Sequence, residues 1–450
     1  MQRSRTLTRL GLSFALLPVY CFGAGSLSPC YPQNATVGGT EIRSLVAHGG
    51  TLYAGNGYWE DESERAHGAQ ILVLDHGRWR VDHLFDEQMA NGRARHLAVA
   101  SMGQAEFTTD ANGKPLPEPV SVLLASTWDL TGDSTVYARN DATGQWDRAT
   151  LAHDSQTPGT DYLAQVRSFG SHRDRVTGVS YAFAGDNPHG IFSGVYDSAV
   201  PGRIRWSQTP ELDLSAVSSA EVGVEKLRVT SFAECNGSLY ATVGQRIYER
   251  VDGASPQWRL VYTNRSPGPG RALTGLRGLT AVPSPDGHGQ VLLAAVEGTA
   301  ARIVRIDPRD GSETTELDLH DYLNKAWGMD VGYMIAAYNN MTPVRGDLLI
   351  GLEAFIPRNS PVAEGHRIFN AGPGRGRLEG DAWYLIRHPN GSYDLHRVPP
   401  RPGQPMVSTR SIVASGDAVY FAGFDANFAQ VHNTGWIVQS TLNGAIRGSH

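Results

Sequence analysis

Apolar and polar residues alternate with a period of two along most of the chain, and short turn sequences interrupt the alternation. The clearest stretch predicts four strands, at 229–234, 239–243, 246–251 and 258–262. Asn236-Gly237 separates the first two, and Asn-Gly is the preferred two-residue hairpin turn because both positions adopt positive φ. Half-buried antiparallel strands have this pattern. We therefore expect an all-β protein.

A three-residue phrase recurs at the start of the predicted strand pairs. An arginine comes first, a small or polar residue second, and an apolar residue third. The copies that begin with arginine are Arg43-Ser44-Leu45, Arg95-His96-Leu97, Arg167-Ser168-Phe169, Arg277-Gly278-Leu279 and Arg410-Ser411-Ile412. In two further copies the first residue is Thr230 or Asn339. Self-similarity along a chain indicates one supersecondary unit used repeatedly.

The copies divide the chain into seven units, at about 41–86, 93–151, 165–214, 227–263, 275–319, 331–398 and 408–442. The last unit offers three strands, and we expect residues 34–40 to pair with residues 435–442 as its fourth. This pattern resembles the seven-bladed β-propeller superfamily, without the signature of any one family. The resemblance implies a single domain in which four-stranded blades form a closed ring. Two packed sandwiches are the alternative all-β interpretation.

The N-terminus predicts export. Three arginines within the first nine residues precede an apolar stretch at 10–24, and small residues at 23–25 offer a cleavage point. We expect a signal peptide over residues 1–25 and a secreted or periplasmic, monomeric protein. The alternatives are a buried N-terminal helix or strand and a lipoprotein signal ending at Cys21. No later segment is long and apolar enough to predict a membrane span.

The net charge and the number of cysteines limit the classes of partner and the disulfides that we expect. A net charge of −6 argues against nucleic acid, because nucleic-acid binders usually present an overall basic face. Cleavage of the signal would leave Cys30 and Cys235, which can form one disulfide but no framework of disulfides. Two unrelated thiols are the alternative.

The propeller resemblance also implies where the arginines lie. In propellers the first strand of each blade follows the central channel and begins at the face that usually carries the ligand site. Arg43, Arg95, Arg167, Arg277 and Arg410 would then surround one opening, with Thr230 and Asn339 completing the ring.

Carboxylates follow the second strand in most units, at Asp129, Asp186, Glu297, Glu353 and Asp425. Each arginine could pair with the nearby acid and fasten the inner strands of its unit, which is a structural role. Alternatively, arginines left unpaired could bind an anion bidentately. Both roles can coexist when some of the arginines are paired and others are not.

Aromatic residues and histidines are expected at the same opening. Tyr58, Trp59 and Trp128 lie in predicted loops there, where they could stack on a sugar or cap the ends of the blades. His96, His189 and His432 share this face, and a histidine of near-neutral pKa is suited to act as a general base. Arg367 lies in the long insertion between Glu353 and Asp381, which resembles a substrate-gripping loop.

The same opening could instead contain a metal-binding site. Asp186, Glu297, Glu353 and Asp425 could bind Ca²⁺ through oxygen ligands near the channel axis. The sequence has no Gly-x-Ser-x-Gly motif, phosphate loop or dinucleotide fingerprint.

Three function classes follow from these residues. The first is an enzyme acting on an acidic carbohydrate, a lyase that cleaves uronates by β-elimination. In it the ring arginines neutralise the carboxylate, and His96, His189 or Tyr58 handles the proton. The second is a calcium-dependent hydrolase or lactonase. The third is a non-catalytic, lectin-like module whose partner is a small anion or a glycan.

Overall fold

The computed structural model describes residues 28–29, 39–58, 68–154, 164–217, 227–264, 275–370, 377–398, 406–424 and 435–447. Within these residues the secondary structure is almost entirely antiparallel β-sheet, with two α-helices and two short 3-10 turns. The expectation of an all-β fold is confirmed. Consecutive strands pair into groups, which are numbered here in chain order.

Groups 1 to 4 follow one another along the first half of the chain. Group 1 consists of β2 Glu41–His48, β3 Thr51–Gly57, β4 Gln70–Asp75 and β5 Arg78–Leu84. Group 2 consists of β6 His96–Thr109, β7 Pro115–Asp129, β8 Asp133–Asn140 and β9 Gln145–His153. Group 3 consists of β10 Gln165–Arg173, β11 Ser180–Asn187, β12 Gly190–Tyr196, and β13 Ile204–Trp206 with β14 Leu212–Asp213, which both pair with β12. Group 4 consists of β15 Val229–Cys235, β16 Ser238–Val243, β17 Arg246–Val251 and β18 Gln257–Thr263.

Groups 5 to 7 complete the described chain. Group 5 consists of β19 Leu276–Pro283, β20 Gln290–Val296, β21 Arg302–Ile306 and β22 Glu313–Asp318. Group 6 consists of β23 Met334–Ala336 and β24 Thr342–Val344, which both pair with β25 Asp347–Ile356, then β28 Trp383–Arg387 and β29 Tyr393–Arg397. Its insertion carries β26 Ile368–Asn370 and β27 Arg377–Glu379. Group 7 consists of β30 Ser408–Ser415, β31 Ala418–Phe424 and β32 Trp436–Thr441.

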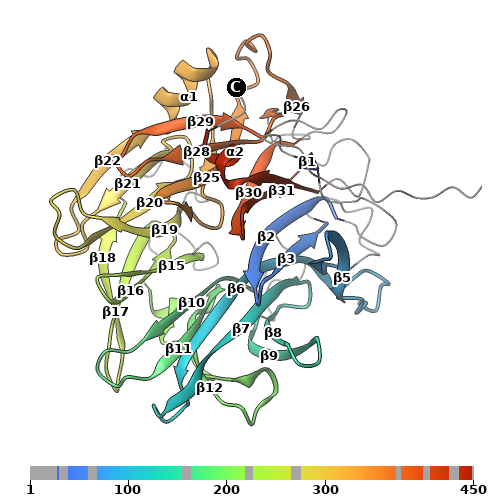
Figure 1. Cartoon of the computed structure of the whole chain (residues 1–450), viewed down its shortest axis with the longest axis vertical. Coiled ribbons are helices and arrows are strands. Elements are labelled where there is room, and N and C mark those ends of the chain that lie inside the picture. Colours follow the sequence, from blue (N-terminus) through green and yellow to red (C-terminus); the bar gives the residue numbers. More distant parts are fainter. Residues whose placement is uncertain are drawn as a thin grey trace, which may run out of the picture.

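The groups follow one another around the molecule, so that group 7 lies beside group 1 (Figure 1). Glu41 at the start of β2 pairs with Phe424 at the end of β31, which joins group 1 directly to group 7. Strand β1, Ser28–Pro29, pairs antiparallel with β32. An N-terminal segment therefore does add to the last group, but it lies earlier in the chain than the expected segment 34–40, of which residues 34–38 lie outside the described residues.

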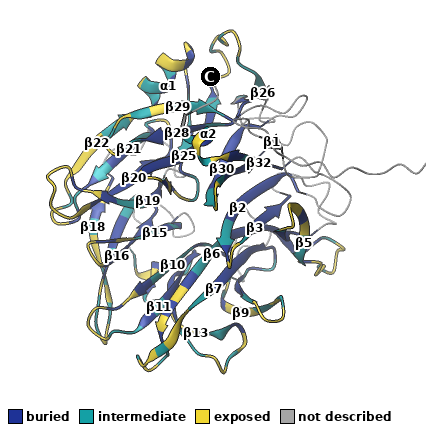
Figure 2. Cartoon of the chain, in the orientation of Figure 1, coloured by how far each residue is buried: buried dark blue, intermediate teal, exposed yellow. Residues whose placement is uncertain are grey.

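The core is divided into clusters that lie between neighbouring groups. Ile71 of group 1 packs with Leu123 of group 2, and equivalent clusters join each group to the next along the chain. A further cluster contains Ile42 of group 1 together with Ile437 of group 7. Figure 2 shows the buried residues along the strands and the exposed ones mainly at turns and outer edges.

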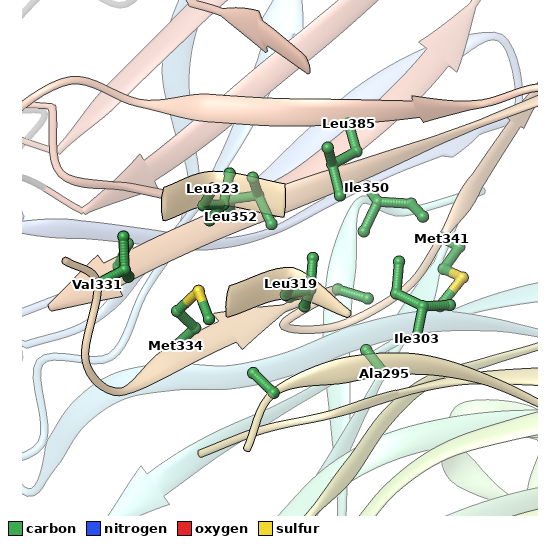
Figure 3. Close-up of a cluster of buried hydrophobic side chains, with 14 of the residues drawn as sticks. Ala295, Ile303, Leu319, Leu323, Val331, Met334, Met341, Ile350, Leu352 and Leu385 are labelled. Carbon is green, nitrogen blue, oxygen red and sulfur yellow. The ribbon is translucent and has the colours of Figure 1, made fainter. Parts of the chain in front are cut away.

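Two helices follow the outer strands. Helix α1, Leu319–Trp327, begins after Asp318, whose side chain accepts a hydrogen bond from the Asp321 N–H, and it ends at Gly328 in the left-handed region. Leu319, Leu323 and Trp327 recur every four residues, so they share one face. That face packs between groups 5 and 6 (Figure 3). Helix α2, Leu442–Arg447, directly follows β32.

The Asn236-Gly237 turn forms as the sequence predicts, with φ of 51° and 77°. Cys235, which precedes it, is buried, and burial raises the pKa of its thiol to about 11. Cys30 lies outside the described residues, so its pairing with Cys235 stays a prediction. Among the residues that the structure describes, no helix has the length and apolar character needed to span a membrane.

Candidate functional site

A β-bulge interrupts the first strand of most groups at an equivalent place. In group 1, Ile42 pairs with Asn56 and Ser44 with Gly55, which leaves Arg43 between them without a cross-strand partner. Bulges commonly redirect a side chain next to a functional site. The residues in the equivalent position of four other groups are Ala100, Arg167, Thr230 and Arg410.

Four of these five residues, Arg43, Ala100, Arg167 and Thr230, line one pocket. The pocket has a cavity volume of about 10 Å³, within about 230 Å³ of empty space that includes open solvent. It is lined by Arg43, Ala100, Arg167, Thr230, Arg277, Tyr338 and Asn339. We call it the arginine pocket. It brings together five of the seven residues that the sequence predicted around one opening. Arg410 is not among the lining residues, but its guanidinium lies over the ring of Tyr338.

Arg95 does not belong to the arginine pocket. Strand β6 has three register shifts, and the one that lies at the pocket falls at Ala100, five residues after Arg95. The copy of the phrase in this group is therefore Ala100-Ser101-Met102. The prediction that placed Arg95 in the ring is corrected on this point. A methyl group stands where an arginine was expected.

The second residue of the phrase has a structural role. The Ser101 hydroxyl donates to the Val166 carbonyl at 2.8 Å, and the Ser168 hydroxyl donates to the Val229 carbonyl at 2.8 Å. The Ser411 hydroxyl accepts from the Leu45 N–H at 2.9 Å, which links group 7 to group 1. Each bond joins the first strands of two neighbouring groups.

Most arginines around the pocket are paired with carboxylates. The Arg277 guanidinium donates to Glu297, and Arg410 contacts both Glu353 (2.9 Å) and Glu41 (3.1 Å). The side chain of Arg43 lies 3.7 Å from that of Glu41. The hypothesis that an arginine pairs with the acid after the second strand of its own unit therefore describes Arg277 and Glu297. Glu41 lies on the same strand as Arg43, and the two described partners of Arg410 come from the adjacent groups.

Arg167 is different. It forms no ion pair with a carboxylate of the described residues, and it donates a hydrogen bond to the Gln165 side-chain oxygen at 3.3 Å. Burial and the positive charges of Arg228, Arg43 and Arg277 lower the pKa of Arg167 well below its usual value. Arginine nevertheless stays protonated near neutral pH. The pocket therefore holds a positive charge that its own side chains do not neutralise.

Tyr338, which the sequence analysis did not single out, lies among these arginines. Its ring centre is 4.0 Å from the Arg410 guanidinium carbon and 4.6 Å from that of Arg277. Its hydroxyl accepts a hydrogen bond from Arg43 Nη2 at 2.8 Å. Burial opposes ionisation of the phenol, but the charges of Arg43, Arg410 and Arg167 outweigh it and lower the pKa of Tyr338 to about 8.

Asn339 lines the pocket and also fastens its backbone. The side-chain amide donates to the carbonyl oxygens of Arg43 and Arg410. It therefore holds together the first strands of groups 1 and 7. Its predicted role as a ligand contact stays a prediction.

Arg95 and His96 belong to a separate polar network. Arg95 contacts Asp129 (2.7 Å), Asp133 (2.6 Å) and Glu87 (2.7 Å). His96 is buried beside two aromatic rings, Phe85 and Tyr137, and its Nδ1 lies 2.8 Å from the Thr127 hydroxyl. Burial lowers the pKa of His96.

His189 forms a dyad with a buried carboxylate. Its Nδ1 lies 2.5 Å from Asp186 Oδ2, and the other oxygen of Asp186 accepts from the Ser134 hydroxyl at 2.5 Å. Burial opposes protonation of His189, but Asp186 outweighs it and raises the histidine pKa. The dyad is not part of the lining of the arginine pocket.

The predicted aromatic and loop residues lie elsewhere. Tyr58 and Trp128 are buried in a small apolar cluster with Leu97 and Leu130, a placement that matches the capping alternative rather than an open sugar platform. Arg367 donates to Asp381 at 2.9 Å in the insertion of group 6. Trp59 and His432 lie outside the described residues.

The three candidate metal ligands that the structure describes do not form one cluster. Glu297 accepts from Arg277 and from the Tyr333 hydroxyl (3.0 Å), Glu353 contacts Arg410, and Asp186 holds His189. Within the described part of the chain, no group of three or more carboxylate, histidine or cysteine side chains has a geometry that could hold a metal ion. Asp425 lies outside that part.

Comparison with known proteins gives distant structural neighbours. No family model and no curated protein matches the chain. An extracellular domain of a putative hybrid two-component system from B. thetaiotaomicron superposes with a TM-score of 0.47 and 10% identity, over 92% of this chain and 39% of that one. Sqt1 of Saccharomyces cerevisiae superposes with a TM-score of 0.41 and 11% identity, over 92% of this chain and 98% of that one.

Proposed function

We propose that the strand groups are the seven blades of a β-propeller, closed by an N-terminal strand on the last group. The support is that the contacts between groups form a closed cycle. Hydrophobic clusters join each group to the next, and a cluster and a serine hydrogen bond join group 7 to group 1. A closed ring leaves each blade packed on both faces. An experimental structure of the mature protein tests this directly, and an open or two-body arrangement would contradict it.

We propose further that the arginine pocket binds a carboxylate-bearing ligand, and that this ligand is an acidic carbohydrate. The observation that carries the proposal is the uncompensated charge of Arg167, which faces other guanidinium groups rather than a carboxylate. A carboxylate would supply the missing charge, and guanidinium groups bind carboxylates through two parallel hydrogen bonds.

The surroundings of Arg167 favour an external anion. Gln165 and Asn187 pair at the inner ends of β10 and β11. At the corresponding places near Arg43 and Arg277 stand Glu41 and Glu297. Amides therefore occupy the two positions of group 3 that hold a carboxylate in group 1 or group 5, and a neutral amide can still orient the guanidinium.

Ligand-induced thermal stabilisation tests this function. The panel consists of oligogalacturonate, the same oligomer with its carboxyl groups reduced, CaCl₂ and EDTA. A ligand at 100 times its Kd adds about 2.7 kcal/mol to the stability of the folded state. We expect a shift with the acidic oligomer alone, lost in Arg167→Gln and kept in Arg173→Gln, an exposed arginine of the same strand. An equal shift with the reduced oligomer, or a full shift in Arg167→Gln, would refute the proposal.

The same panel separates the other two classes. A calcium-dependent hydrolase or lactonase predicts a shift with CaCl₂ that EDTA reverses. A lectin-like module predicts the oligomer shift without turnover. Export through a signal peptide at residues 1–25 remains part of the proposal. Its test is the N-terminal sequence of the protein recovered from the periplasm or medium.

A further inference from the structure

We propose that Tyr338 is the proton-accepting residue of the arginine pocket, and that the pocket catalyses β-elimination on a bound β-alkoxy carboxylate such as an oligouronate. This inference rests on the carboxylate binding proposed above. The sequence had assigned the proton transfer to His96, His189 or Tyr58, and none of these lines the pocket.

The backbone places Tyr338 at the pocket by breaking a strand. In group 6 the first strand is split into β23 and β24, and residues 337–341 form the connection. Ala337 takes a φ of 51°, which is unfavourable for a residue with a side chain. Strain of this kind is concentrated at functional sites. Here the strained connection places the Tyr338 phenol among the arginines that line the pocket.

The contacts of Tyr338 suit a base rather than a ligand-stacking ring. The guanidinium groups of Arg410 and Arg277 lie over the Tyr338 ring, and Arg43 donates to its hydroxyl oxygen at 2.8 Å. Three guanidinium groups around one phenol favour the phenolate, which can accept a proton. A catalytic pKa close to the working pH gives the most effective proton transfer.

The reaction balances without a co-reactant. The ligand carboxylate binds at Arg167, which stabilises the negative charge that develops when the neighbouring C–H bond breaks. The Tyr338 phenolate takes that proton, and the C–H electron pair forms a C=C bond. The C–O bond at the β-carbon breaks, and the leaving oxygen takes a proton from solvent. The products are an unsaturated acid and an alcohol.

The test is turnover of oligogalacturonate and oligomannuronate by the full-length mature protein, followed by the ultraviolet absorbance of the conjugated acid. We expect wild-type turnover and a loss of roughly 10²–10⁴-fold in kcat for Tyr338→Phe. The ligand-induced thermal shift of Tyr338→Phe should remain, because the phenol is not the group that binds the carboxylate.

The outcomes separate this inference from the proposed function. An Arg167-dependent shift without turnover overturns the base and leaves the binding function intact, whereas no shift and no turnover overturns both. Turnover by Tyr338→Phe at the wild-type rate also overturns the base. If that variant does not fold, the pH profile of wild-type kcat decides: the rate should rise with pH up to about 8. A rate that is already constant well below pH 7 contradicts the inference.

Discussion

Gln165 lies two residues before Arg167, at the register position that Glu41 occupies two residues before Arg43. Gln165 pairs with Asn187 across the sheet, as Glu41 pairs with Gly57. The two strands are otherwise built alike, with an arginine at the bulge and a serine after it. The difference between them is the residue two positions earlier. Arg43 has the buried carboxylate of Glu41 as a counter-charge, whereas Arg167 has the neutral amide of Gln165.

A carboxylate introduced at residue 165 should weaken ligand binding in the arginine pocket. Gln165→Glu would place an acid beside Arg167, neutralise the pocket and compete with the ligand. We expect a higher melting temperature for the free protein and a Kd for oligogalacturonate weakened about tenfold, which is about 1.4 kcal/mol. Titration calorimetry and thermal melts measure both quantities.

The matched control is Gln145→Glu, which adds the same charge at an exposed position on β9. It should change neither the affinity nor the melting temperature appreciably. If Gln165→Glu bound the oligomer as tightly as the wild-type protein, Arg167 would not be the residue that holds the carboxylate.

Two arginines of the pocket should respond to mutation in opposite directions. Arg277→Gln leaves Glu297 buried without its counter-charge, and breaking a buried pair costs about 3–5 kcal/mol. Arg167→Gln removes a charge that burial and neighbouring arginines already disfavour, so the free protein should be as stable or more stable. Melting temperatures of both variants without ligand make the comparison. Equal destabilisation would assign Arg167 a structural role instead.

Local patterns in the sequence predicted the all-β fold and the hairpin at Asn236-Gly237, because strand periodicity and turn chemistry are properties of neighbouring residues. The copy in group 2 was misplaced because the alignment was keyed on arginine. Ala100-Ser101-Met102 keeps the serine and the apolar residue but lacks the arginine. The serine, which bonds to the next group, was the better guide to register.

Tyr338 escaped prediction for a different reason. Its place in the pocket depends on a break between β23 and β24, and no residue spacing signals such a break. The partners of the acids were equally hidden, since Glu353 reaches Arg410 of the following group. Contacts between units depend on how the units pack, which a repeat pattern within one unit does not specify.

Ala100 leaves room in the arginine pocket where other groups place a long side chain. Ala100→Leu should fill part of that space and abolish the thermal shift with oligogalacturonate, because the ligand and the new side chain would compete for one volume. The melting temperature without ligand serves as the control for overpacking. An unchanged ligand shift in a stable Ala100→Leu protein would place the bound anion outside this pocket.

A network on Arg250, in groups 3 and 4, should govern the loss of stability in acid. The fully buried Arg250 contacts Asp174 (2.8 Å) and Asp252 (2.8 Å), and Asp174 also accepts from the Thr177 and Gly253 N–H groups. Burial opposes the charged form of Asp174, but these hydrogen bonds outweigh it and hold the pKa below its usual value. The same balance, with Arg175 and His172 as partners, lowers the pKa of Asp252.

A carboxyl group whose pKa is lower in the folded state stabilises the fold above its unfolded pKa of about 3.9, and the stabilisation disappears as the pH falls through the folded value. The melting temperature should therefore change little between pH 7 and about 5 and fall steeply below about 4. Asp174→Asn should cost about 2 kcal/mol at pH 7 and flatten the acid limb of the profile. A variant that loses stability in acid as steeply as the wild-type protein would show that other carboxylates control the transition.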